Sequence, residues 1–160
     1  MDQNIYPVLH NVSSAQRVRE FAQLALGMGC TCCVISQAKG AAATAGVPAA
    51  VKTLAREAKT SLLYLENLTD TSEILQPTKV VLLISKRFAK TRFNPQLVLE
   101  EARTGKVLLV VGGTSPGLTR RELDMGEVSY IVDKNYDIGP IAQIAMALYA
   151  IENQIEPNLK

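Results

Sequence analysis

The chain has 160 residues, of which 48% are hydrophobic and 20% are charged. This length fits one domain, and the composition excludes intrinsic disorder. The formal net charge of +2 is too small to indicate a nucleic-acid-binding protein by itself, and the 3 cysteines, which lie close together, exclude a disulfide framework. No apolar stretch reaches the roughly 18 residues that span a membrane, and the first residues lack a secretory signal, so we expect a cytoplasmic protein.

Apolar runs that predict strands alternate with segments of helical periodicity along the whole chain. Strands are predicted at residues 5–9, 32–35, 61–65, 80–84, 106–111 and 128–132. Helices are predicted at residues 15–26, 48–58, 71–75, 95–103, 119–123 and 138–152, and the Ala- and Gly-rich residues 39–46 are predicted to form a loop. Buried strands separated by helices indicate an α/β fold, in which helices cover both faces of a parallel sheet. We expect a single domain over residues 1–160.

The last predicted helix is apolar almost all round, since only Gln143 and Glu152 are clearly polar. A helix of this kind buries two faces. One face would pack on the sheet, and the other would be covered by a second subunit or by the rest of the same domain.

The most informative segment is the predicted strand 107–111, which runs directly into Gly112-Gly-Thr-Ser-Pro-Gly-Leu118. Glycines at the carboxyl end of a parallel strand let a ligand approach the backbone, and this edge is where α/β folds bind ligands. The segment has neither Walker nor Gly-x-Gly-x-x-Gly spacing. The next strand is followed by Asn135-Tyr-Asp-Ile-Gly-Pro140, so the two loops predict the walls of one cleft. The alternatives are an ordinary glycine turn and, for Asp137, a helix cap.

The order of these features resembles the carboxyl-terminal half of the SPOUT methyltransferases, especially the SpoU branch. In this chain a predicted strand is followed by the Gly-rich segment, by a short helix with Arg-Glu-Leu and by a further strand. Asp-Ile-Gly comes next, and it leads into an apolar helix that ends in Leu-Tyr-Ala-Ile-Glu. In the family the corresponding segments read Gly-Ser-Glu-Gly-x-Gly-Leu, then Ser-Leu-Asn, then a helix ending in Leu-Tyr-Glu. The amino-terminal half, with Val8-Leu-His-Asn-Val12 before a helix, is compatible with the resemblance, which covers most of the chain.

The resemblance implies a trefoil knot near the carboxyl terminus and a homodimer through the knot and the last helix. It also implies S-adenosylmethionine as cofactor and RNA as methyl acceptor. Asn11 and Arg17 match the ends of the SpoU motif Asn-x-Gly-x-x-x-Arg, with Ser13 in place of Gly, and are thereby implied as catalytic residues. The residues implied at the cofactor are Ile84, Ser85, Gly112, Gly113, Thr114, Gly117, Ile131, Asp137, Ile138 and Gly139.

The chain departs from the SpoU pattern at three polar positions. Thr114 replaces the Glu of Gly-Ser-Glu-Gly, and Asp137 and Gly139 replace the Ser and Asn of Ser-Leu-Asn. The resemblance predicts an S-adenosylmethionine-dependent methyltransferase of tRNA or rRNA, with the ribose 2′-oxygen as one candidate acceptor. The departures favour the alternative, a catalytically degenerate SPOUT-fold dimer that binds RNA or acts as a scaffold.

One segment supports RNA as a partner independently of the resemblance. Residues 86–93 follow a predicted buried strand and hold four cations and two phenylalanines. Cations contact phosphates, and aromatic rings stack on bases. The alternative is a solvated loop whose phenylalanines pack into the core. The predicted RNA-binding residues are Lys86, Arg87, Lys90, Arg92, Arg120 and Arg121.

Three cysteines and one histidine complete the candidates. Cys33 would point away from Cys30 and Cys32 on a strand, and His10 is the single histidine, so we expect buried packing residues and no metal site. His10 stands near the end of the first strand, as a general base would. No Ser or Cys in a nucleophile context accompanies it, so a hydrolase triad is not predicted.

Overall fold

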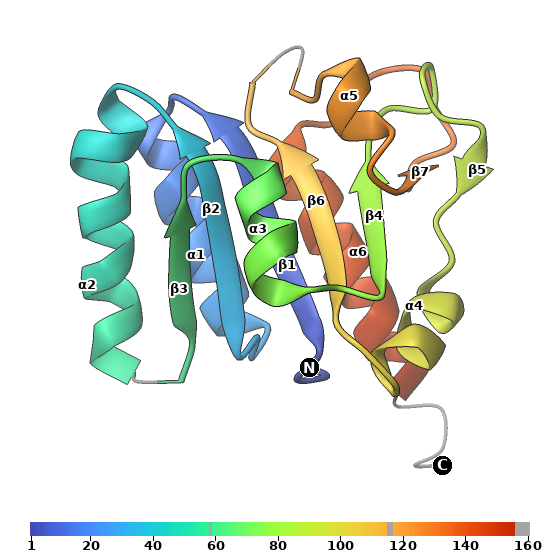
Figure 1. The fold of residues 1–160 in the computed structure, drawn as a ribbon, viewed down its shortest axis with the longest axis horizontal. Helices are drawn as coiled ribbons and strands as arrows, with labels where there is room; N and C mark the ends of the chain where they lie inside the picture. The colour runs from blue at the N-terminus through green and yellow to red at the C-terminus, as the bar shows by residue number, and fades with distance from the viewer. Residues whose placement is uncertain (58, 115–116, 156–160) are drawn as a thin grey trace.

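The computed structural model describes residues 1–57, 59–114 and 117–155. Seven strands form one sheet in the order β3-β2-β1-β6-β4-β7-β5, and all neighbouring strands are parallel (Figure 1). The strands are β1 (Ile5–Val12), β2 (Cys32–Ala38), β3 (Ser61–Leu65), β4 (Lys79–Leu83), β5 (Thr91–Arg92), β6 (Val107–Gly112) and β7 (Glu127–Tyr130).

Helices cover both faces of this sheet. Helices α1, α2, α4 and α6 pack on one face, and α3 and α5 pack on the other (Figure 1). The prediction of one α/β domain with a parallel sheet between helices is therefore confirmed. The helices are α1 (Ala15–Gly27), the π-helical turn η1 (Ala42–Gly46), α2 (Val47–Glu57), α3 (Leu68–Leu75), α4 (Pro95–Ala102), α5 (Arg120–Leu123) and α6 (Pro140–Ile155).

Side-chain caps explain where several helices begin. Ser14 accepts a hydrogen bond from the amide of Arg17 at the start of α1, and Asn67 accepts one from the amide of Asp70 at the start of α3. Asn94 caps α4, in which Pro95 occupies the first turn, where its missing amide hydrogen costs nothing. These caps are short-range signals, so the helix positions could be predicted from the sequence.

The structure corrects two predictions of secondary structure. Residues 39–46 do not form only a loop, because residues 42–46 make the π-helical turn η1. At Gly46 a Cβ atom would lie 3.0 Å from the Cα of Ala15 and 3.0 Å from the Cβ of Val18, so the small residues let this turn pack closely on α1. The short strand β5 is absent from the prediction, since its two residues are exposed and show no apolar pattern.

The strand order places a break in topology near the middle of the sheet. Strands β1, β2 and β3 follow one another outward, whereas β6 is inserted between β1 and β4. Val8 of β1 pairs with Val110 of β6, although about a hundred residues separate them. In open parallel sheets, ligands bind beyond the carboxyl ends of the strands at such a break. The knot itself stays a prediction.

The last helix buries only part of its apolar surface. Ile144, Leu148 and Ile151 are fully buried, whereas Met146 and Tyr149 are 44% and 66% exposed. The expectation that one face packs on the sheet is met, and the other face is open in the single chain. No helix in the described ranges is both long and apolar enough to cross a membrane.

Candidate functional site

The predicted site residues lie at the carboxyl ends of β1, β4, β6 and β7 or in the segments that follow these ends. Because the sheet is parallel, these four ends lie at one edge of it (Figure 1). The structure therefore brings the predicted residues to one side of the molecule. Ser115 and Pro116, which belong to the predicted Gly-rich loop, lie outside the described residues.

The Gly-rich loop after β6 is fixed to the end of β1 and to the first turn of α1. The amide of Gly113 donates to the His10 carbonyl at 2.7 Å, and the Arg17 guanidinium donates to the Gly113 carbonyl. A Cβ atom on Gly113 would lie 2.6 Å from the Cβ of Val12 and 3.0 Å from the Asn11 carbonyl oxygen. Glycine is thus required by close packing against β1. Arg17 holds the backbone of this loop, and its predicted catalytic role stays a prediction.

Three more predicted residues are constrained at this edge, one by its backbone conformation and two by close packing. Asn11 has a φ of 55°, a left-handed conformation that costs a non-glycine residue free energy. Gly112 and Gly117 face each other so closely that a Cβ on Gly112 would lie 2.4 Å from the Cα of Gly117. The glycines bring the two ends of the loop into contact with each other.

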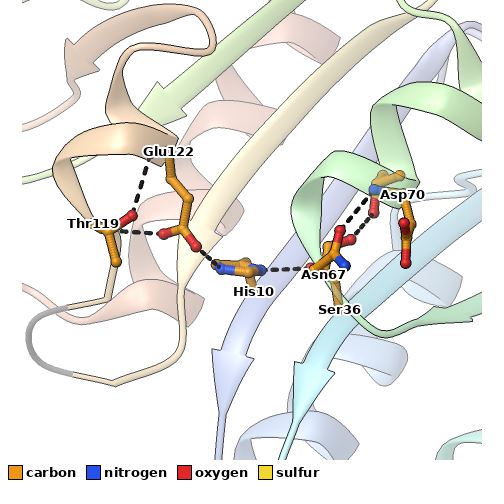
Figure 2. Close-up of polar contacts among 7 residues, drawn as sticks. His10, Ser36, Asn67, Asp70, Thr119 and Glu122 are labelled. Atoms are coloured by element: carbon orange, nitrogen blue, oxygen red, sulfur yellow. Dashed lines mark hydrogen bonds and ion pairs between the residues drawn. The ribbon is translucent and has the colours of Figure 1, made fainter.

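A buried hydrogen-bonded chain runs below this loop (Figure 2). His10 Nδ1 lies 2.7 Å from Ser36 Oγ, and His10 Nε2 lies 2.7 Å from Glu122 Oε1. A carboxylate only accepts hydrogen bonds, so Nε2 carries the proton and donates to Glu122, and Nδ1 accepts from the Ser36 hydroxyl. The second oxygen of Glu122 accepts from the amide of Thr119, whose hydroxyl caps α5. This chain connects β1 and β2 to α5.

The electrostatics of this chain favour neutral histidine and ionised glutamate. Burial lowers the pKa of His10 below its ordinary value and outweighs the opposing effect of Glu122. Burial alone would raise the pKa of Glu122, but the Thr119 amide and His10 lower it overall. His10 and Ser36 are fully buried, so neither reaches a ligand at the surface. The histidine therefore positions α5 and the Gly-rich loop.

A small hollow lies between the ends of β4 and β7 and the start of α6. It has room for about one water molecule, about 10 Å³. Four residues of the predicted cofactor set line it, together with the buried Gln143. The glycines and Thr114 of the predicted set do not line it. The four are Ile84, Ser85, Ile131 and Ile138.

Residues 133–139 close one side of this hollow. Asp137 accepts hydrogen bonds from the amide of Gly139 at 2.8 Å and from Gln143 Nε2 at 3.2 Å, so it joins the segment before α6 to a side chain of that helix. The alternative for that residue, a helix cap, stays a prediction. Gly139 has a φ of +87°, which an L-residue rarely adopts. As it stands, this hollow is smaller than S-adenosylmethionine, and we derive no chemical step through that cofactor.

The predicted RNA-binding residues divide into free and paired cations. Arg87, Lys90 and Arg92 are exposed on the loop and short strand that follow β4. Lys86 pairs with Asp133, whose hydrogen bond raises the pKa of the lysine. Arg120 on α5 is exposed at the same edge, as is its neighbour Arg121.

The two phenylalanines of this segment behave differently. Phe93 is 8% exposed and belongs to the core, as the alternative interpretation expects, whereas Phe88 is 71% exposed. The guanidinium of Arg87 lies 5.6 Å from the centre of the Phe88 ring. One aromatic ring is thus available at the surface beside a cation.

Solved structures with the same fold include SpoU-like methyltransferases. A candidate RNA methyltransferase from Bacillus anthracis superposes with a TM-score of 0.70 over 96% of this chain and 96% of its own, at 15% identity. The SpoU methyltransferase AviRb from Streptomyces viridochromogenes, solved with AdoMet, gives 0.69 over 97% of this chain and 62% of its own, at 11% identity. The predicted SPOUT-like fold is therefore confirmed; identities this low establish fold alone.

The sequence comparisons point to another activity. Residues 40–150 match the family model described as RecB-family nuclease (DUF2122). The chain belongs to this family. A candidate type II restriction enzyme from Aeropyrum pernix is 38% identical over 149 residues, which cover 93% of both chains. A second, from Methanocaldococcus jannaschii, is 33% identical over 147 residues, covering 92% of this chain and 95% of its own.

These matches correct the predicted function. The expectation of an RNA methyltransferase, with a degenerate RNA-binding or scaffolding dimer as its alternative, is wrong, because the family is described as a nuclease and its relatives are named as restriction enzymes. The resemblance misleads for a physical reason: glycines that follow a buried strand and an apolar last helix are features of the fold, and one fold serves many chemistries.

The family description implies a divalent metal ion, since nucleases of this type hold metals with clustered acidic side chains. Among the described residues there is no group of three or more His, Cys, Asp or Glu side chains that could hold a metal ion. Cys30 and Cys33 are buried, and burial raises the pKa of Cys33 to about 12. Residues 1–57, 59–114 and 117–155 supply no such acidic cluster, and we derive no step through a metal ion.

Sequence reasoning misses the partners of His10. Ser36 and Glu122 contact it from positions 26 and 112 residues away in the chain. One local signal is present, because Thr119 and Glu122 have the spacing of a capping box. That signal locates the start of α5, but no pattern in the sequence connects α5 to His10.

Proposed function

We propose that this protein acts on nucleic acid, which it holds along the carboxyl edge of its sheet. The observation that carries the proposal is the set of exposed cations at that edge. Arg87, Lys90 and Arg92 lie on one side, and Arg120 and Arg121 lie on α5. Such cations bind phosphates and release the counterions that surround them.

The surroundings of these cations support a binding surface. Asp133 faces Lys86 and neutralises it, so the remaining cations of the loop have no acidic partner among the ion pairs of the described residues. The Gly-rich loop beside α5 is held by Arg17 and by the His10 chain. A surface whose supports are fixed in this way loses little conformational entropy on binding. The names of the two relatives, as candidate restriction enzymes, agree with nucleic acid as the partner.

Hydrolysis of the phosphodiester backbone is the second part of the proposal, and the family description favours it. The geometry supplies cations that would hold the phosphate, but the one histidine is buried and already has two hydrogen-bond partners. We therefore propose the activity without assigning a general base. S-adenosylmethionine, which AviRb binds, is left outside the proposal because the hollow is too small for it.

The test compares two pairs of substitutions that remove the same charge. Lys90→Gln with Arg92→Gln neutralises the proposed surface, and Lys52→Gln with Arg56→Gln neutralises exposed cations on α2. Affinity for a labelled oligonucleotide is measured by fluorescence anisotropy at several salt concentrations. We expect the first pair to weaken binding and to reduce the slope of log K against log salt by about two, and the control pair to change neither.

Cleavage is followed on the same oligonucleotides and on plasmid DNA, with magnesium, with manganese and with a chelator. Products formed by the wild type and reduced in the Lys90→Gln/Arg92→Gln variant would support hydrolysis at this edge. Binding without cleavage would remove the hydrolytic part and leave the binding part. Equal binding by both variant pairs would end the proposal.

A further inference from the structure

The loop between β4 and β5 exposes an aromatic ring that the fold does not use. Phe88 is 71% exposed, although burial of a phenylalanine side chain would stabilise the fold. A turn holds it there, since the amide of Phe88 donates to the Ser85 carbonyl at 2.9 Å. The neighbouring Ala89 and Phe93 are buried and fix the two sides of the loop.

A second exposed ring lies on the segment that packs beside this loop. Tyr136 is 88% exposed. Its segment is joined to the Phe88 loop by the Ser85 hydroxyl, which donates to the Asn135 carbonyl at 3.4 Å, and by the Lys86–Asp133 ion pair. The two rings are therefore carried by connected segments at one edge of the sheet.

A cation lies beside the Phe88 ring, since the Arg87 guanidinium is 5.6 Å from the centre of that ring. The Lys86 ammonium lies 5.7 Å from the centre of the ring of Tyr130, the last residue of β7, and not beside Tyr136. A ring flanked by cations offers two contacts to a nucleotide, one to the face of the base and one to the phosphate. Bases within a duplex are stacked on one another, so only an unpaired base can use the face of such a ring.

The amount of charge also bears on the form of the nucleic acid. The whole chain has a net charge of +2, and Asp133 neutralises one of the four cations of this loop. This loop can therefore contact few phosphates. Contacts with phosphates supply most of the affinity when a protein binds duplex DNA without recognising its sequence. Stacking on Phe88 and Tyr136 would supply what the charge does not.

We propose that the preferred ligand is single-stranded nucleic acid, with unpaired bases stacked on Phe88 and Tyr136 and with Arg87 and Lys90 on the adjoining phosphates. The inference rests on the proposed function, since it names the form of nucleic acid that the same edge binds. DNA and RNA share the chemistry on which it depends, and the two are separate arms of the test.

The sequence offers a clean reporter, because the chain contains no tryptophan. Phe88→Trp places a single indole at the proposed stacking position. Tyr64→Trp is the matched control, since Tyr64 is 50% exposed on β3, at the edge of the sheet farthest from β5. We expect single-stranded oligonucleotides to quench the fluorescence of the first variant and to leave that of the second unchanged.

Affinities are measured by anisotropy with single-stranded DNA, single-stranded RNA and a duplex of the same sequence. We expect the single strands to bind at least about tenfold more tightly than the duplex. Phe88→Ala is expected to weaken single-strand binding by about tenfold to a hundredfold without changing the salt slope, because a stacking contact releases no counterions. Phe88→Leu keeps apolar bulk and is expected to bind as weakly as Phe88→Ala.

The outcomes separate this inference from the proposed function. If the duplex binds as well as the single strands and Phe88→Ala changes nothing, while Lys90→Gln/Arg92→Gln still weakens binding, the proposed function stands and the inference is overturned. Full affinity in Phe88→Leu would also overturn it. If no oligonucleotide binds to the wild type, the proposed function itself fails. Phe88 is exposed, so urea unfolding of its variants should match the wild type and exclude misfolding as the cause.

Discussion

His10 makes the stability of this protein depend on pH. Its pKa is lowered in the folded state from an ordinary value of 6.5, so the unfolded chain binds a proton at a higher pH than the folded chain does. The contribution of neutral His10 to the free energy of unfolding is present above pH 6.5. It is lost as the pH falls from that value through the pKa of His10 in the folded state. A single titrating group gives a slope of the free energy of unfolding of at most about 1.4 kcal/mol per pH unit in that window. Glu122, whose pKa is also lowered, adds a loss below its ordinary value of 4.5.

We therefore predict that the unfolding free energy of the wild type falls between pH 7 and pH 5.5, as measured by urea denaturation. His10 is the only histidine, so His10→Gln removes every imidazole titration from the comparison. The variant should be less stable at pH 7 and should show a flatter profile in this window. The same slope in both proteins would contradict the assignment of a neutral His10.

At Gly113 the neighbouring atoms leave no room for a side chain. A Cβ atom there would lie 2.6 Å from the Cβ of Val12, so Gly113→Ala should cost about 1–3 kcal/mol through overpacking. Gly27 is the matched control, because a Cβ added there meets nothing within 4 Å and the residue ends α1. We expect Gly27→Ala to leave the urea midpoint unchanged or to raise it. Equal stability of the two variants would show that the Gly-rich loop is not packed on β1 as described.

Helix α5 depends on its cap more than the longer helices do. It has only four residues, and Thr119 and Glu122 form a complete capping box at its start. Removing an N-cap hydroxyl typically costs about 0.5–2 kcal/mol. Because Glu122 also accepts a hydrogen bond from His10, loss of the cap should change the surroundings of the imidazole ring.

We predict that Thr119→Ala lowers stability by about 1 kcal/mol and shifts the NMR resonances of the His10 ring. Thr104→Ala is the control, because that exposed hydroxyl donates only to the Glu101 carbonyl, at 3.3 Å. The control should move neither the urea midpoint nor the histidine signals. An unchanged histidine spectrum in Thr119→Ala would mean that the cap does not hold Glu122 in place.

At the level of elements, the sequence predicts the sheet well for a physical reason. Strands buried on both faces need continuous apolar runs, and the runs at 5–9, 80–84 and 106–111 correspond to β1, β4 and β6. The same rule cannot find β5, whose two residues are exposed. It also misses η1, where alanine and glycine serve close packing and show no apolar period.

The sequence is enough to locate the candidate site at one end of the strands, but not to predict the hydrogen bonds between its residues. The glycines and the cations stand where the carboxyl ends of strands put them, which the alternation of strands and helices is enough to locate. The contacts of Arg17 with Gly113 and of His10 with Glu122 join residues 96 and 112 positions apart. Contacts of this range depend on the complete strand order, in which β6 is inserted beside β1. Local patterns carry no information on that order.

For the whole molecule, the open face of α6 bears on the oligomeric state. Ala142, Met146 and Tyr149 are exposed and follow the spacing of one helical stripe, opposite the buried Ile144, Leu148 and Ile151. Exposure of large apolar side chains in a stripe is unfavourable in water and is relieved when a second copy covers it. We propose that α6 forms the interface of a homodimer, as the sequence resemblance implies.

Sedimentation equilibrium tests this proposal. The wild type, with a chain mass of 17.3 kDa, should sediment with twice that mass at micromolar concentration. Met146→Glu with Tyr149→Glu should give the monomer. In a dimer each subunit of this variant would bury two unpaired carboxylates, and the free energy of burying them would exceed the gain from association. Val51→Glu, on an exposed position of α2, should remain dimeric. A monomeric wild type would show that the α6 stripe is tolerated in water, and a dimeric double variant would place the interface on another face.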